Sequence, residues 1–141
     1  MIITGSIDSG QLQQAELIYR SILTELGLPD EFELELDFVD EEEITQLNKQ
    51  HRQKHKPTDV LSFCYVELRK PFNKADYCAD INPESDLIML GSIVICKAKM
   101  GEFSFGQLVA HGILHLFGFD HETDADYERM SEIEQRINGD V

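Results

Sequence analysis

The sequence predicts one domain, spanning residues 1–141, of the α/β (α+β) class, in which helices pack on a small mixed β-sheet. Residues 32–38 alternate strictly between apolar and acidic side chains, which is typical of a strand with one wet face. Two further runs, 59–66 and 87–96, are apolar on both faces and suit interior strands. Between these runs, apolar residues recur at helical spacing. A chain of 141 residues is long enough to bury one full core.

The helices of the first half are predicted from periodicity and capping residues. The first begins at residue 9 or 10, runs to 26 and ends at Gly27, because glycine readily adopts the left-handed conformation of a C-cap. Asp40 is predicted to cap a second helix that continues to about His51, with acidic residues placed favourably at its N-terminus. The inner face of the first helix is predicted to carry Leu12, Ala15, Leu17, Ile18, Ile22, Leu23 and Leu26.

In the second half, residues 69–85 are polar and are predicted to form a loop or insertion. A helix is predicted from about Ser104, followed by a loop around Phe119 and a C-terminal helix capped near Thr123. Cys64 and Cys96 lie in strand-like runs and are predicted to be core residues, as are three aromatic residues, Phe63, Phe117 and Phe119.

The most informative motif is His111-Gly-Ile-Leu-His115-Leu-Phe-Gly-Phe-Asp-His121. Residues four apart lie one above the other on a helix, so His111 and His115 share a face. Gly118 can leave the helix with a positive φ and bring His121 back beside them. Three neutral imidazoles that converge on one point form a ready site for one Zn²⁺ per chain, with a fourth position open. The sequence therefore predicts a metal site on a central helix and the loop after it.

The histidine motif has other interpretations. Two buried histidines without a metal would need partners, and no acidic residue lies between 103 and 119 to provide one locally. The spacing overlaps that of zinc peptidases, but Gly112 stands where those enzymes carry their glutamate general base. Asp120 could orient a ligand imidazole, cap the last helix or act as a fourth ligand, which would make the site structural.

A second motif, Lys56 to Phe63 (KPTDVLSF), stands upstream of the histidines and follows Leu47-Asn48 and Arg52. With the histidine motif, it resembles the YbeY family of bacterial single-strand-specific endoribonucleases, over roughly Phe32 to Arg136. The resemblance implies a zinc-dependent enzyme acting in rRNA processing, including 16S rRNA 3′-end maturation, and in ribosome quality control. The implied partners are single-stranded rRNA and the small ribosomal subunit, with no DNA substrate.

Arg52 and His111 are the predicted catalytic residues. A guanidinium stays charged and binds phosphate through two parallel hydrogen bonds, so Arg52 is the candidate clamp for the scissile phosphate, and the resemblance assigns it the same role. Lys54 and Lys56 could position the RNA backbone or simply be solvated. The chain departs from the family pattern at Ser92, where an acidic residue is usual, and at Gln107, where a histidine is usual.

The net charge of −15 is unfavourable for RNA binding, because phosphate binding normally leaves a basic footprint. Charge is unevenly distributed, however. Residues 21–48 contain ten acidic residues and no Lys or Arg, whereas residues 49–56 contain four basic residues and no acidic one. This asymmetry predicts a local basic rim on an acidic body, and hence weak, selective RNA binding.

The three cysteines are odd in number and widely spaced, which predicts free thiols in a reducing cytoplasm. No cleavable leader and no membrane-spanning run are expected. Two other function classes remain: a zinc hydrolase of another bond, such as an amide, and a non-catalytic, zinc-stabilised ribosome-assembly factor. The missing glutamate at 112 and the basic stretch argue against the first. The lack of a nearby fourth His or Cys argues against the second.

Overall fold

The computed structural model describes residues 1–52, 58–119 and 124–139. Within them, five strands form one mixed sheet of order β1-β2-β5-β3, with β4 also paired to β5. β1, β2 and β5 are parallel, whereas β3 and β4 run antiparallel to β5, so the predicted mixed sheet is confirmed. The strands are β1 (Ile2–Ile3), β2 (Phe32–Phe38), β3 (Val60–Cys64), β4 (Ile81–Asn82) and β5 (Leu87–Ile95).

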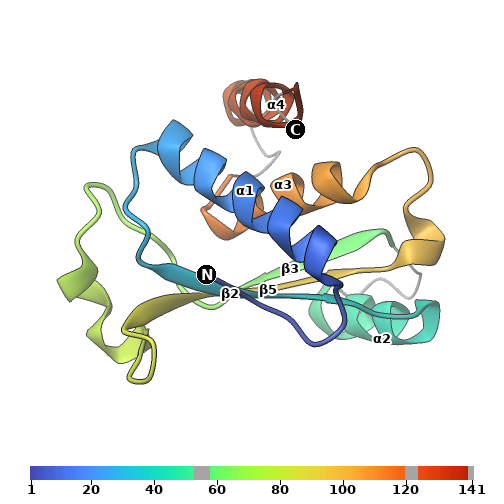
Figure 1. The fold of residues 1–141 in the computed structure, drawn as a ribbon, viewed down its shortest axis with the longest axis horizontal. Helices are drawn as coiled ribbons and strands as arrows, with labels where there is room; N and C mark the ends of the chain where they lie inside the picture. The colour runs from blue at the N-terminus through green and yellow to red at the C-terminus, as the bar shows by residue number, and fades with distance from the viewer. Residues whose placement is uncertain (53–57, 120–123, 140–141) are drawn as a thin grey trace.

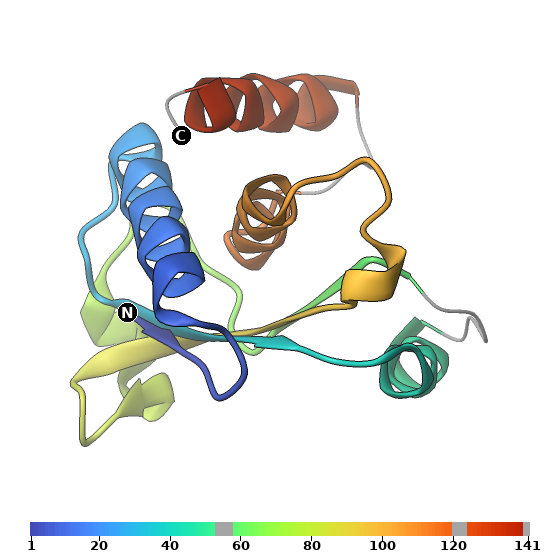
Figure 2. The same cartoon turned by 45° about the vertical axis from the view of Figure 1, so that its right-hand side comes forward.

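The helices cover both faces of this sheet. α1, α3 and α4 lie on one side and α2 on the other (Figure 1). α3 is sandwiched between the sheet and α4, which makes it the central helix of the larger layer (Figure 2). The helices are α1 (Ser9–Leu26), α2 (Glu41–Arg52), α3 (Phe105–Leu116) and α4 (Asp124–Gly139), with short 3-10 helices at η1 (Lys74–Asp80) and η2 (Lys97–Lys99). None of the described helices is both long enough and apolar enough to cross a membrane.

The main core fills the space between the sheet and α1, α3 and α4. Leu34 and Leu36 of β2 pair with Gly91 and Ile93 of β5, and the three side chains among these four are fully buried against the helices. A smaller cluster of Ile44, Leu61 and Cys96 holds α2 on the opposite face. The two clusters fix α2 and α3 on opposite sides of the same strands.

α1 begins and ends much as its sequence predicts. Gly27 at its C-cap has φ of 67°. Leu17, however, is 56% exposed, so its predicted inward placement is wrong. The buried stripe runs through Ala15, Ile18 and Ile22, and Tyr19 at the neighbouring position faces the core in place of Leu17. Leu17 lies away from this stripe because each residue turns by about 100° around the helix.

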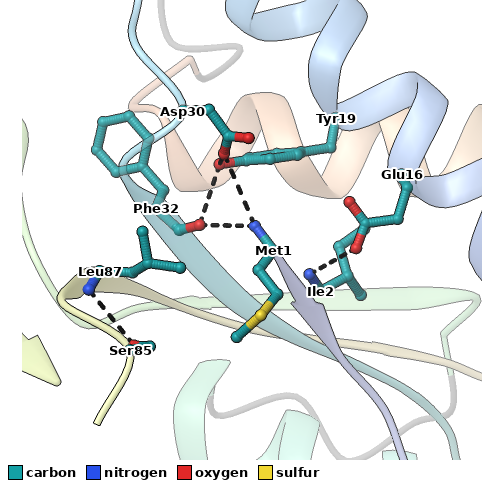
Figure 3. A network of polar contacts seen from close by, with 8 residues as sticks. All are labelled: Met1, Ile2, Glu16, Tyr19, Asp30, Phe32, Ser85 and Leu87. Atoms are coloured by element: carbon teal, nitrogen blue, oxygen red, sulfur yellow. Dashed lines mark hydrogen bonds and ion pairs between the residues drawn. The ribbon is translucent and has the colours of Figure 1, made fainter. Parts of the chain in front are cut away.

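Tyr19 also carries a polar group into the core (Figure 3). Its hydroxyl lies 2.8 Å from Asp30 Oδ1 and 3.0 Å from the Phe32 carbonyl oxygen. Burial, together with the hydrogen bond to Asp30, raises the pKa of Tyr19, so the phenol stays neutral at physiological pH. This contact ties α1 to the start of β2.

The wet face predicted for β2 is only partly present, because Glu35 and Asp37 are partly exposed but Glu33 is not. Glu33 is fully buried, and Asn82 of β4 donates a hydrogen bond of 2.9 Å to its Oε1. The region 69–85, predicted to be a loop or insertion, contains the 3-10 helix η1 and the short strand β4. Asn73 caps η1 by accepting a hydrogen bond from the Ala75 amide, and Tyr77 is buried. A contact such as that of Glu33 with Asn82, between residues so far apart in the chain, leaves no signal in the sequence of β2 itself.

The predicted start of α2 is confirmed, and the predicted ends of α2 and β3 differ from the structure by one or two residues. Asp40 Oδ1 accepts a hydrogen bond of 2.8 Å from the Glu43 amide, and α2 extends one residue past the predicted end, to Arg52. The predicted strand over 59–66 is shorter, at Val60–Cys64. The cap predicted near Thr123 lies outside the described residues.

Candidate active site

α3 starts at a capping box that uses Gln107. The Ser104 hydroxyl accepts a hydrogen bond from the Gln107 amide at 3.1 Å, and Gln107 Oε1 accepts one from the Ser104 amide at 2.8 Å. These two bonds satisfy amides that the first helical turn leaves without partners. Gln107, one of the two departures from the family pattern, therefore acts in capping the helix.

The structure brings His111 and His115 together one turn apart on α3. Their Nε2 atoms are 2.9 Å apart, and their rings meet edge to face with centroids 4.4 Å apart. Both residues are half-buried. The apolar residues of α3 pack into the core, so the two imidazoles stand on the side of the helix that faces away from it.

Glu134 of α4 is the acidic partner of His111, and it comes from outside the stretch 103–119, which has no acidic residue. Its Oε1 lies 3.0 Å from His111 Nδ1. A carboxylate can only accept, so His111 Nδ1 carries the proton that it donates. One signal could have identified Glu134: it lies four residues after Met130, on the buried stripe of α4 that includes Ile133 and Ile137.

This arrangement tests whether the residues fit a metal ion. Two imidazole nitrogens 2.9 Å apart would repel each other if both presented bare lone pairs. Either one nitrogen donates a proton to the other, or both bind the same metal ion. Zinc holds imidazole nitrogens at about 2.0–2.1 Å in a tetrahedral site, where two ligands are about 3.3 Å apart. The observed spacing is close to that value. Glu134 then occupies the place of the carboxylate that commonly supports a zinc-bound histidine.

Some predicted site residues are outside the described part of the chain. These are His121, Asp120, Lys54 and Lys56. In the described ranges, no group of three or more His, Cys, Asp or Glu side chains could hold a metal ion, so a third ligand would have to come from elsewhere. α2 ends at Arg52, but the side chain of Arg52 is also outside the described part.

Gly112 packs directly on the sheet. A Cβ atom built there would lie 2.9 to 3.2 Å from three side-chain atoms of Ile93. Position 112 therefore faces the core, whereas His111 and His115 face away from it. A side chain at position 112 would crowd Ile93, and because the residue is a glycine, α3 lacks the glutamate general base of a zinc peptidase.

Cys64 contacts the backbone of α3 at His115. It is exposed, so its predicted place in the core is wrong, because β3 ends at this residue. Its thiol donates a hydrogen bond of 3.4 Å to the His115 carbonyl oxygen, and burial of part of the side chain raises its pKa. Cys96 is buried and Cys78 is exposed, and all three described cysteines are free thiols.

Ser92, the second departure from the family pattern, lies away from the histidines. Its hydroxyl contacts the Tyr65 hydroxyl at 2.7 Å and donates to Glu35 Oε2 at 3.2 Å. Ser92 and Glu35 are paired neighbours in β5 and β2, on the face of the sheet opposite to Ile93 and α3. The sheet itself therefore separates this hydroxyl from α3.

Comparison with known proteins assigns the chain to a family. A family model described as Endoribonuclease YbeY matches residues 4–141. The chain belongs to the YbeY endoribonuclease family. An endoribonuclease YbeY of Acinetobacter baumannii is 36% identical over 140 residues, covering 90% of this chain and 82% of the relative. A YbeY of Bacillus pumilus is 33% identical over 147 residues, covering 97% and 89%.

A further YbeY relative, from Thermoanaerobacter pseudethanolicus, is 34% identical over 143 residues, covering 93% of this chain and 88% of the relative. Among solved structures, the solution structure of TM1509 from Thermotoga maritima is similar, with a TM-score of 0.54 and 24% identity. The match covers 99% of this chain and 91% of that one, and it supports the fold. The resemblance to the YbeY family seen in the two sequence motifs is thus confirmed.

Proposed function

We propose that this YbeY-family chain is a zinc-dependent endoribonuclease that cuts single-stranded RNA during rRNA processing. The observation that carries the proposal is the pairing of His111 and His115 Nε2 at 2.9 Å with Glu134 behind His111, in a chain of this family. His121 would complete the ligand set, with one metal ion per chain. Three protein ligands leave one position open, as in catalytic zinc sites.

The residues of the chain then have distinct tasks. The bound metal ion would supply a Lewis acid that polarises a phosphate oxygen or lowers the pKa of a water molecule. His111, His115 and His121 hold that ion, and Glu134 keeps the proton of His111 on Nδ1 so that Nε2 points at the ion. Arg52 clamps the scissile phosphate and stabilises the charge that develops on it, and Lys54 and Lys56 position the RNA backbone.

RNA is favoured over peptide as the substrate for a structural reason. The glutamate base of zinc peptidases would have to stand at position 112, where this chain has a glycine packed against Ile93. The proposal extends to the cellular role that the family resemblance implies: 16S rRNA 3′-end maturation and ribosome quality control, at the small subunit, in the cytoplasm.

The test combines metal analysis with a choice of substrates. Purified protein should contain about one zinc per chain, and it should lose this zinc when His111, His115 or His121 is changed to alanine. The protein should cut single-stranded RNA in preference to structured RNA and leave casein intact. A chelator should stop RNA cleavage, and added zinc should restore it. Cleavage should weaken as salt rises, because phosphate contacts release counterions.

Two results would contradict the proposal. Full metal occupancy in all three alanine variants would show that the histidines are not the ligands. Metal-loaded protein that digests casein but not RNA would show that the bond class is wrong.

A further inference from the structure

A groove lies where α1 and α3 end, because its lining includes Leu26 to Pro29 and Leu116 to Phe119. It consists of two cavities of about 720 and 740 Å³. Lys70, Phe117, Phe119 and Arg129 line both cavities, so the two lie side by side and are together called the groove. Each volume falls in the range of roughly 300–1,000 Å³ that is usual for small-molecule sites.

The charge of this groove is the reverse of that of the whole chain. The chain has 12 Lys and Arg against 27 Asp and Glu. The described residues that line the groove include four basic and two acidic ones, Arg69, Lys70, Lys74, Arg129, Glu31 and Glu67. On an acidic surface, such a concentration of positive charge marks a place where an anion can approach.

Three of the four basic side chains are available to a ligand. Lys74 forms an ion pair with Asp86 at 3.1 Å. Arg69, Lys70 and Arg129 are exposed, and the ion pairs found among the described residues involve none of these three. Their charges therefore face solvent inside a concave site whose lining is both polar and apolar.

The floor of the groove is aromatic. Phe72, Phe117 and Phe119 are half-buried: each packs against the main core and also lines the groove. The Arg129 guanidinium lies 5.8 Å from the centre of the Phe119 ring. The prediction that Phe117 and Phe119 are core residues is thus correct for only part of each ring. Cationic groups alternating with aromatic rings are the chemistry that binds single-stranded nucleic acid, through phosphates and stacked bases.

The groove begins beside the candidate active site. One end is lined by Cys64, whose thiol contacts the His115 carbonyl, and by Leu116 to Gly118, which directly follow His115. A strand whose scissile phosphate lies at the histidines can therefore continue into the groove. Double-stranded RNA would not expose its bases to the aromatic floor.

We infer that this groove binds the single-stranded RNA next to the bond that is cut. Arg69, Lys70 and Arg129 neutralise its phosphates, and Phe117 and Phe119 receive its bases. The groove makes the enzyme favour substrates long enough to reach from the histidines to Arg69. The inference rests on the proposed function, because it assigns the strand to the substrate of that site.

The experiment compares a long single-stranded RNA with a short one that spans the cut site but cannot reach Arg69. Three variants remove groove contacts: the double variant Arg69→Ala/Lys70→Ala, Arg129→Ala, and Phe119→Leu, which keeps apolar volume but loses the ring. Arg20→Ala is the matched control, because Arg20 is an exposed arginine on α1 outside the groove. Thermal unfolding verifies that every variant is folded.

For the long RNA, the double variant should raise KM on the order of 10-fold and reduce the dependence of binding on salt by about one unit of slope per lost phosphate contact. Phe119→Leu should also raise KM on the order of 10-fold but leave the salt slope unchanged, since stacking carries no charge. The short RNA should be affected much less. Arg20→Ala should match the wild type on both RNAs.

The outcomes separate this inference from the proposed function. If the wild type cuts both RNAs and the groove variants cut the long RNA as well as it does, the groove is not part of the RNA site and the proposed function stands. Equal losses in Arg20→Ala and the groove variants would show a general effect of charge and would also overturn the inference. If the wild type neither binds nor cuts either RNA, both are wrong.

Discussion

Removal of the Glu134 carboxylate is the perturbation that tests most directly how the site is held. Glu134 Oε1 accepts a hydrogen bond from His111 Nδ1 at 3.0 Å, and the two side chains are 27% and 30% exposed. Loss of a carboxylate behind a metal-binding histidine typically weakens metal binding roughly 10- to 100-fold. This corresponds to about 1.4–2.7 kcal/mol. Because the pair is partly exposed, solvent screening favours the lower part of that range.

Glu134→Ala should therefore raise the zinc dissociation constant roughly 10-fold, and Glu134→Gln should raise it less, because the amide oxygen can still accept the hydrogen bond. Zinc affinity is measured by competition with a chelating indicator, so the readout does not depend on RNA cleavage. Glu132→Gln is the matched control, since Glu132 is an exposed carboxylate on the same helix. Wild-type affinity in Glu134→Ala would refute the argument that this carboxylate orients His111. An equal loss in Glu132→Gln would show that only the overall charge of α4 matters.

Three further predictions concern catalysis and packing. Arg52→Ala should lower RNA cleavage on the order of 100-fold with unchanged zinc content, and Arg52→Lys should restore little because the planar fork is lost; a wild-type rate would move the phosphate clamp to another residue. Gly112→Ala should lower the free energy of unfolding by about 1 kcal/mol in urea titration, since the crowding at Ile93 outweighs the gain in helix propensity. That loss should shrink in an Ile93→Val background, and an equal loss in both backgrounds would exclude the contact as its cause. Tyr19→Phe should also cost about 1 kcal/mol, because the hydroxyl loses its contacts with Asp30 and the Phe32 carbonyl; an unchanged urea midpoint would show that these contacts contribute nothing.

Several features of this protein could be predicted from short stretches of sequence, because the interactions that produce them act within a few residues. Asp40 and Gly27 mark helix boundaries through contacts with their own neighbours. The meeting of His111 and His115 follows from the pitch of a single helix. The order of apolar strands and amphipathic helices was sufficient to predict a mixed sheet.

The features that were missed depend on segments far apart in the chain. Glu33 alternates with apolar residues like any residue of a wet face, but it is buried and bonded to Asn82, 49 residues later. Leu17 is as apolar as Ile18, but the direction from which the sheet packs against α1 decides which of them is buried. Hydrophobicity records that a side chain can be buried, and the tertiary structure decides where.

The sequence by itself determined the family, the histidine pair and the absence of a glutamate at position 112. Only the tertiary structure brought Glu134 to His111, because a contact across 23 residues depends on how α4 packs on α3. The tertiary structure also forms the groove, because it brings Arg69 and Arg129, 60 positions apart in the chain, to one cavity lined by aromatic rings. Local periodicity describes one face of one element, whereas a binding site needs several faces whose orientation is set by the shared core.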